Sequence, residues 1–120
     1  MTVLLVALGA AVGAPLRYVT DQFVQAKAPA VVLPWGTLIV NVIGSFLLGM
    51  MAAASARGGL SDDALALGGI GFCGALSTYS TFSYDTVRLL EDGNPSAGLV
   101  NIVVNLAGGL AAAAAGWWLV

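Results

Sequence analysis

Charged side chains are scarce in this sequence. Of its 120 residues, 8% are charged, with four Lys or Arg and six Asp or Glu. A soluble domain carries about 25% charged residues, and a water-exposed surface with far fewer would leave large apolar patches. Apolar residues make up 59% of the chain, and the mean hydropathy is +0.95. The shortage of charge therefore excludes a soluble globular domain and places the chain in a lipid bilayer.

Histidine is absent, and cysteine occurs once, as Cys73. A single cysteine cannot form an intrachain disulfide. The sequence also contains no cluster of metal-ligating residues and no pair of nucleophile and base, which an enzyme active site requires. We therefore expect neither an enzyme nor a nucleic-acid partner.

Four stretches of the chain contain no ionised side chain: 1–16, 28–56, 64–84 and 93–120. A membrane-spanning helix needs roughly 20 apolar residues. We predict an all-α membrane protein with a single domain, 1–120, whose four transmembrane helices lie at about 2–23, 33–55, 64–90 and 97–119. Such a chain is a multi-pass protein of the cell membrane (inner or plasma membrane), surrounded by lipid, with both termini on one side.

The connections and chain ends carry weaker signals. No Lys or Arg precedes the first apolar run, so we expect a retained helix and not a cleaved signal peptide. Short connections follow at 21–33, 57–63 and 91–96, and Ser61 is placed to cap the third helix. Lys27 and Arg88, with Arg17 nearby, lie at one end of the bundle, and Arg57 lies with the amino terminus at the other. So small a difference leaves the orientation nearly undetermined and permits an antiparallel dimer.

The third predicted span contains a dense group of polar residues at membrane depth. Five hydroxyl side chains and two aromatic rings fall within seven residues, 77–83. A buried hydroxyl without a partner costs about 1–3 kcal/mol, so five together indicate a polar lining. This lining has hydrogen-bond donors and electron-poor ring edges but no titratable group, which favours a small anion.

Glycine is abundant, with 16 residues. Small residues recur at every fourth position, as in Gly9 and Gly13, and predict close packing of helices in lipid. Four glycines precede the polar group, and each lowers helix stability by roughly 0.8–1 kcal/mol relative to alanine. We expect the third helix to break near 74–80, where free carbonyls would suit a cation and where irregular backbone requires burial or a cavity.

Further polar residues lie in the second and fourth spans. Thr37 and Asn41 are one helical turn apart, as are Asn101 and Asn105. An asparagine in hydrocarbon either joins helices by a hydrogen bond or lines a pathway; we favour the pathway for Asn41 and leave both open for Asn101. Proton-coupled transport uses an intramembrane Asp, Glu or His, and we expect no acid inside spans two to four. Passive anion conduction is therefore the favoured function.

Four segments, taken in order, resemble the Fluc (CrcB) family of fluoride channels. They are Gly-Ala-Pro-Leu-Arg-Tyr at 13–18, Gly-Thr-Leu-Ile-Val-Asn-Val-Ile-Gly-Ser-Phe at 36–46, Gly-Phe-Cys-Gly-Ala-Leu-Ser-Thr-Tyr-Ser-Thr-Phe-Ser at 71–83 and Asn-Ile-Val-Val-Asn-Leu-Ala-Gly at 101–108. The resemblance implies an antiparallel, dual-topology homodimer with two pathways, which exports fluoride passively down its electrochemical gradient and protects the cell from fluoride toxicity. It also implies a structural sodium ion at the dimer centre.

The resemblance implies roles for particular residues as well. The backbone carbonyls of Gly74 and Ser77 would bind sodium, and Arg17 is structural or lies at a vestibule. The aromatic pair of the family is Phe-Phe, whereas this chain has Tyr79 and Phe82, so the phenol of Tyr79 needs a partner. Together with the polar residues of the second span, the expected fluoride pathway comprises Thr37, Asn41, Tyr79, Ser80, Thr81, Phe82, Asn101 and Asn105.

Two other functions fit a short four-helix membrane protein. A small multidrug exporter needs a carboxylate inside the first span, and this span has no acid before Asp21. In a protein without transport activity, the polar residues would only join helices. That alternative predicts that Phe82→Ile and Asn41→Ala leave ion flux unchanged.

Overall fold

The computed structural model describes residues 1–27 and 34–120, and within them it shows only helices and their connections. Four helical stretches in these ranges are long and apolar enough to cross a membrane: Thr2–Val24, Trp35–Ala56, Asp62–Glu91 and Pro95–Leu119. The prediction of an all-α chain with four transmembrane helices is therefore confirmed. Part of the first predicted connection and the predicted start of the second span, within 28–33, lie outside the described residues.

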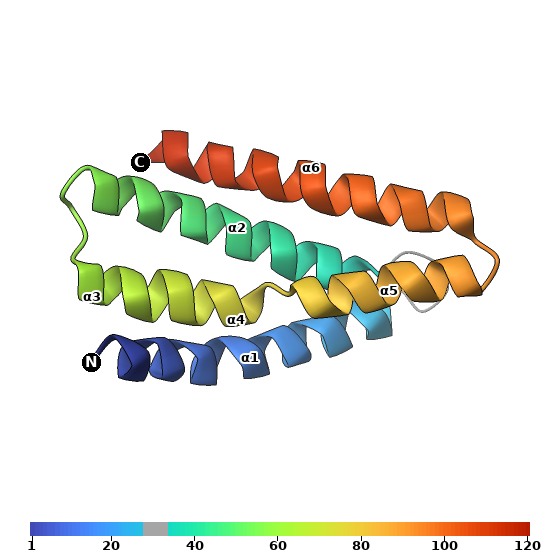
Figure 1. The fold of residues 1–120 in the computed structure, drawn as a ribbon, viewed down its shortest axis with the longest axis horizontal. Coiled ribbons are helices and arrows are strands. Elements are labelled where there is room, and N and C mark those ends of the chain that lie inside the picture. The colour runs from blue at the N-terminus through green and yellow to red at the C-terminus, as the bar shows by residue number, and fades with distance from the viewer. Residues whose placement is uncertain (28–33) are drawn as a thin grey trace.

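The four stretches lie alongside one another, and the two termini lie at the same end of the bundle (Figure 1). The first is α1 (Thr2–Lys27), the second α2 (Trp35–Ala56) and the last α6 (Pro95–Leu119). The third consists of four elements: α3 (Asp62–Ala64), η1 (Leu65–Cys73), α4 (Gly74–Leu76) and α5 (Tyr79–Glu91).

Glycines bring neighbouring helices into backbone contact. A Cβ on Gly9 would collide with the carbonyl of Leu67, and a Cβ on Gly71 would collide with the carbonyl of Val6. These positions join α1 to η1, and Gly49 joins α2 to the backbone of α6 in the same way. Close approach of this kind gains van der Waals contact, which holds helices together in lipid.

The first half of the third span is wound more widely than an α-helix. Ser61 caps it, since Ser61 Oγ accepts a hydrogen bond from Ala64 N–H at 3.1 Å, and the predicted cap is confirmed. Residues Leu65–Cys73 then form a π-helix. This conformation is rare in proteins, and where it occurs it is often found at functional sites. The glycines of this segment predict a weak helix, but not this winding.

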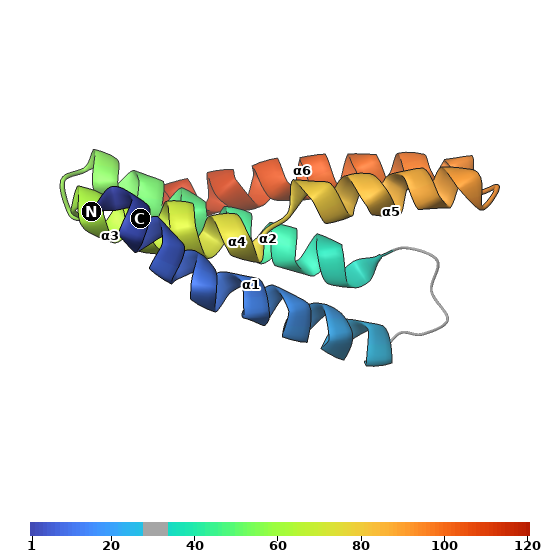
Figure 2. The same ribbon diagram turned by 60° about the horizontal axis from the view of Figure 1, so that its bottom comes forward.

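The third span breaks at Ser77 and Thr78. Both residues have extended backbone, with ψ angles of 159° and 128°, between the end of α4 at Leu76 and the start of α5 at Tyr79. After the break, α5 lies along α6, while α1 diverges from it (Figure 2). The break thus transfers the span from a contact with α1 to a contact with α6.

Candidate functional site

Two side chains hold the break open by binding the N–H groups that would otherwise close the helix. In a continuous α-helix, Thr78 N–H would donate to the Gly74 carbonyl. It donates instead to Asn41 Oδ1, at 2.7 Å. Likewise Thr81 N–H, the α-helical partner of the Ser77 carbonyl, donates to Thr78 Oγ1 at 3.1 Å. The carbonyls of Gly74 and Ser77 therefore lose their α-helical partners.

Three hydroxyl groups around the break, those of Ser77, Thr78 and Ser80, are bound to one another or to the backbone. Ser77 Oγ donates to the Cys73 carbonyl at 2.9 Å, and Ser80 Oγ lies 3.3 Å from Thr78 Oγ1. Throughout the described residues, every buried side-chain nitrogen or oxygen has a hydrogen-bond partner. These bonds offset the cost of placing polar groups at membrane depth.

A cavity of about 490 Å³, termed here the break cavity, opens beside the extended segment. The rings of Tyr79 and Phe82 line it, with centroids 6.0 Å apart and planes inclined at 55°. Tyr79 is 80% exposed, so its ring is accessible from outside the chain. The cavity brings together six residues predicted for sodium or fluoride: Asn41, Gly74, Ser77, Tyr79, Phe82 and Asn105.

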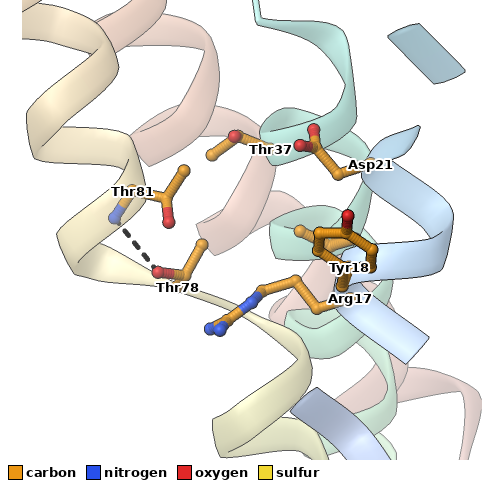
Figure 3. Close-up of a pocket in the computed structure, with 7 residues that line it drawn as sticks. Arg17, Tyr18, Asp21, Thr37, Thr78 and Thr81 are labelled. Carbon is orange, nitrogen blue, oxygen red and sulfur yellow. Dashed lines mark hydrogen bonds between the residues drawn. The ribbon is translucent and has the colours of Figure 1, made fainter. Parts of the chain in front are cut away.

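A second cavity, of about 170 Å³, lies between α1, α2 and α5 (Figure 3). We term it the arginine cavity, because the side chain of Arg17 extends into it from α1 toward Thr78 (Figure 3). Thr37 and Thr81 line it as well, together with Asp21. Because Thr78 lines both cavities, the break separates them. The guanidinium group carries a permanent positive charge beside the break, which Asp21 offsets in part.

Asp85 is a site residue that the sequence interpretation missed. It lies on α5 inside the third span, and its Oδ2 accepts a hydrogen bond from Thr37 Oγ1 at 2.9 Å. The expectation that spans two to four contain no internal acid is therefore wrong. The charge-free stretch of the sequence ends at Tyr84, but the helix continues to Glu91, so Asp85 lies within the span and contacts Thr37 of α2. Asp85 follows Phe82 by about one helical turn, and this spacing could have indicated that Asp85 lies on the helix of the third span.

Three asparagines join α2, α6 and α5. Asn41 Nδ2 donates to Asn105 Oδ1, and Asn105 Nδ2 donates to the backbone carbonyl and Oδ1 of Asn101, each at 2.9 Å. Asn101 Nδ2 in turn donates to Thr86 Oγ1 at 2.9 Å, and Thr86 Oγ1 donates to the Phe82 carbonyl at 2.8 Å. Asn101 is 1% exposed and lines neither the break cavity nor the arginine cavity. Thr86 was not singled out by the sequence.

The structure divides the predicted pathway residues into groups. Four of them line the break cavity, and Thr37 and Thr81 line the arginine cavity. Ser80 is exposed next to Thr78, and Asn101 is buried behind Asn105.

These features define a multi-pass membrane protein in which an interrupted helix places backbone carbonyls and side-chain donors at membrane depth. Residues 4–117 match the family described as CrcB-like protein, Camphor Resistance (CrcB). The chain belongs to this family, and the resemblance drawn from the four sequence segments is confirmed.

Relatives of similar length share about half of the residues. The fluoride-specific ion channel FluC 1 of Streptomyces avermitilis is 51% identical over 118 residues, which cover 98% of this chain and 94% of the relative. FluC 1 of Frankia casuarinae is 49% identical, over 97% of this chain and 93% of its own length. FluC 1 of Thermobifida fusca is 47% identical, over 99% of both chains.

Proposed function

We propose that this chain is a fluoride-specific ion channel, which exports fluoride passively down its electrochemical gradient and so protects the cell from fluoride toxicity. The relatives above are named as fluoride-specific ion channels. The structural observation that carries the proposal is the break at Ser77 and Thr78. The carbonyls that lose their α-helical partners there, and the polar side chains that line the cavities on either side, support the proposal.

The fluoride pathway in this proposal crosses the break from the arginine cavity to the break cavity. Fluoride is small and strongly hydrated, so the protein must replace its water with several converging donors. The charge of Arg17 attracts an anion into the arginine cavity. Hydroxyl and carboxamide groups then donate hydrogen bonds, and the ring edges of the break cavity carry partial positive charge. The proposed pathway residues are Thr37, Asn41, Tyr79, Ser80, Thr81, Phe82 and Asn105, and Asn101 supports the pathway from behind Asn105.

The proposed channel is an antiparallel homodimer with two pathways. One chain leaves the break cavity open and the ring of Tyr79 exposed. A second copy covering that opening would exclude lipid from the polar lining, as irregular backbone at membrane depth requires. Arg17, Lys27 and Arg88 lie toward one end of the bundle, and Arg57 and the amino terminus lie at the other. This small difference is compatible with insertion in both orientations.

A structural sodium ion fits the carbonyls of Gly74 and Ser77. Hard cations prefer oxygen ligands, and both carbonyls lie at the break cavity without their α-helical partners. One chain offers too few such oxygens to enclose an ion, so the site belongs at the centre of the dimer. When bound there, the ion would supply positive charge that favours an anion nearby.

Purified protein in liposomes loaded with potassium fluoride tests the channel function directly. With a potassium ionophore present, a fluoride electrode should record rapid release, whereas chloride-loaded liposomes should release little. Phe82→Ile removes a ring of the break cavity and should slow fluoride release strongly. The control, Val3→Ala, alters a residue that is 82% exposed near the start of α1, and should release fluoride at the wild-type rate.

Equal efflux of fluoride and chloride would overturn the proposed function. So would unchanged fluoride release from Phe82→Ile, because that result matches a protein whose polar residues only join helices.

A further inference from the structure

A continuous chain of hydrogen bonds begins at the residue before α5, passes through α2 and α6, and ends on α5. It starts at Thr78 N–H, at the break, and ends on the carbonyl of Phe82. Its links run through Asn41, Asn105, Asn101 and Thr86, and each is 2.7–2.9 Å long. Asn101 and Thr86 are 1% and 8% exposed and line neither of the two cavities. We term this chain the amide relay.

The two ends of the relay impose one direction on every carboxamide between them. A backbone N–H can only donate, and a backbone carbonyl can only accept. Thr78 N–H therefore requires the oxygen of Asn41, which turns the amino group of Asn41 toward Asn105. At the other end, the Phe82 carbonyl takes the hydroxyl hydrogen of Thr86. The oxygen of Thr86 is then left to accept from the amino group behind it.

This direction decides what Asn41 offers to the break cavity. Asn41 Nδ2 carries two hydrogens and donates one of them to Asn105. The second hydrogen is left for another acceptor, and Asn41 lines the cavity beside Phe82. A carboxamide rotated by half a turn would present its oxygen there instead. Since an anion binds donors and is repelled by acceptors, the orientation of Asn41 determines whether the cavity favours an anion.

We propose that Thr86 and Asn101 are positioning residues for fluoride conduction, which act through Asn105 to keep the amino group of Asn41 available to an anion in the break cavity. This inference rests on the proposed channel function and deepens it. Neither Thr86 nor Asn101 contacts the ion in this proposal. Asn105 Nδ2 donates to both the backbone carbonyl and Oδ1 of Asn101, and the second bond depends on Thr86, which accepts from the Asn101 amino group. Their effect reaches the cavity because this second bond holds Asn105 Oδ1 where it accepts from Asn41.

Comparing Thr86→Val with Thr86→Ser shows whether Thr86 acts through the hydrogen bonds of the relay or only through packing. Valine has nearly the shape of threonine but neither accepts from Asn101 nor donates to Phe82, whereas serine keeps the hydroxyl. Leu89→Val is the packing control, because Leu89 is a buried apolar residue one turn further along α5. Thr86→Val should lower fluoride efflux from liposomes about tenfold and lower the ratio of fluoride to chloride flux, while Thr86→Ser and Leu89→Val stay within about twofold of wild type.

A second measurement follows the relay independently of ion flux. The chain has four asparagines, so selective 15N-asparagine labelling in detergent micelles gives a small set of side-chain NH2 resonances. Thr86→Val should shift the NH2 resonances of Asn101, Asn105 and Asn41, the last of which lies three links away. Thr86→Ser and Leu89→Val should leave the Asn41 resonances in place.

The outcomes separate the two proposals. Unshifted Asn41 resonances in folded Thr86→Val would overturn the relay. Shifted resonances with wild-type flux and selectivity would overturn the positioning role and leave the channel function standing. Wild-type protein that releases no fluoride would overturn the channel function, and the positioning role with it.

Discussion

The two halves of the third membrane span are built in different ways. Before the break, η1 packs against α1 through glycine, and backbone meets backbone at Gly9 and Gly71. After the break, α5 contains no glycine, and side chains join it to its neighbours: Thr37 binds Asp85 from α2, and Asn101 binds Thr86 from α6. Shape fixes the first half, and polar contacts fix the second.

This difference separates a packed scaffold from the proposed fluoride pathway. A closely packed backbone contact leaves no room for an ion and cannot be rearranged without opening a void. Hydrogen bonds between side chains can be exchanged for bonds to an ion, since their net contribution is small when new partners replace the old. We therefore expect substitutions in the first half to change stability and substitutions around the second half to change flux.

The largest effect is expected at Asn41, where the second half is attached. Asn41→Ala removes the acceptor of Thr78 N–H and the donor to Asn105. Because each stranded buried partner costs about 1–3 kcal/mol, we expect fluoride efflux to fall about hundredfold. Ser55→Ala, a polar truncation on the same helix away from both cavities, should retain wild-type efflux. A fluoride electrode on loaded liposomes measures both, and efflux from Asn41→Ala near the wild-type rate would remove Asn41 from the pathway.

Gly9 tests the scaffold half. Gly9→Ala places a methyl group against the backbone of η1 and should lower the free energy of unfolding by about 1–3 kcal/mol, because overpacking forces the helices apart. Gly108→Ala is the matched control, since its Cβ would lie 3.4 Å from Val42 Cγ2, an ordinary contact. Thermal unfolding in detergent should show a lower Tm for Gly9→Ala only. Equal Tm values for the two variants would show that the glycine contact is not what fixes this half.

Arg17 lies where α1 diverges from α5, and it tests whether that divergence admits an anion. Arg17→Gln removes the positive charge of the arginine cavity and should slow fluoride efflux about fivefold, equivalent to roughly 1 kcal/mol at a partly exposed site. The loss should shrink at high ionic strength, because salt screens exposed charge. Arg57→Gln is the control. Arg57 is an exposed residue at the C-terminal end of α2, whereas the arginine cavity lies near the start of that helix, so this variant should leave efflux unchanged. A loss for Arg17→Gln that does not depend on salt would indicate a structural role.

The sequence predicts the four membrane spans well, because each depends on a long run without charge. The cap at Ser61 also follows from local chemistry, since a serine before two acids satisfies the first free N–H groups of a helix. The π-helix at Leu65–Cys73 does not follow from the sequence. Its winding depends on the contact with α1, and glycines signal a weak helix without specifying how it deforms.

The partners of polar residues were harder to predict than their presence. Spacing places Asn101 and Asn105 on one face of a helix, but not which oxygen each amino group meets. Asp85 was missed for a related reason. A charge near the end of a span is usually assigned to the interface, and only the structure brings it beside Thr37. Local patterns thus predict the elements, whereas contacts between helices decide the site.

The two halves of the third span each begin with a helix cap, and the smallest effect is expected when the cap at Ser61 is removed. Ser61 Oγ accepts from Ala64 N–H in the first half, and Thr78 Oγ1 accepts from Thr81 N–H in the second, at 3.1 Å in both. Ser61→Ala should cost about 1 kcal/mol of stability, as a lost cap typically does, and leave efflux unchanged. Thr78→Ala loses the equivalent cap, and should slow efflux as well because Thr78 lies between the two cavities. Parallel Tm and efflux measurements distinguish them; if Ser61→Ala also slowed efflux, the two halves would not be separable.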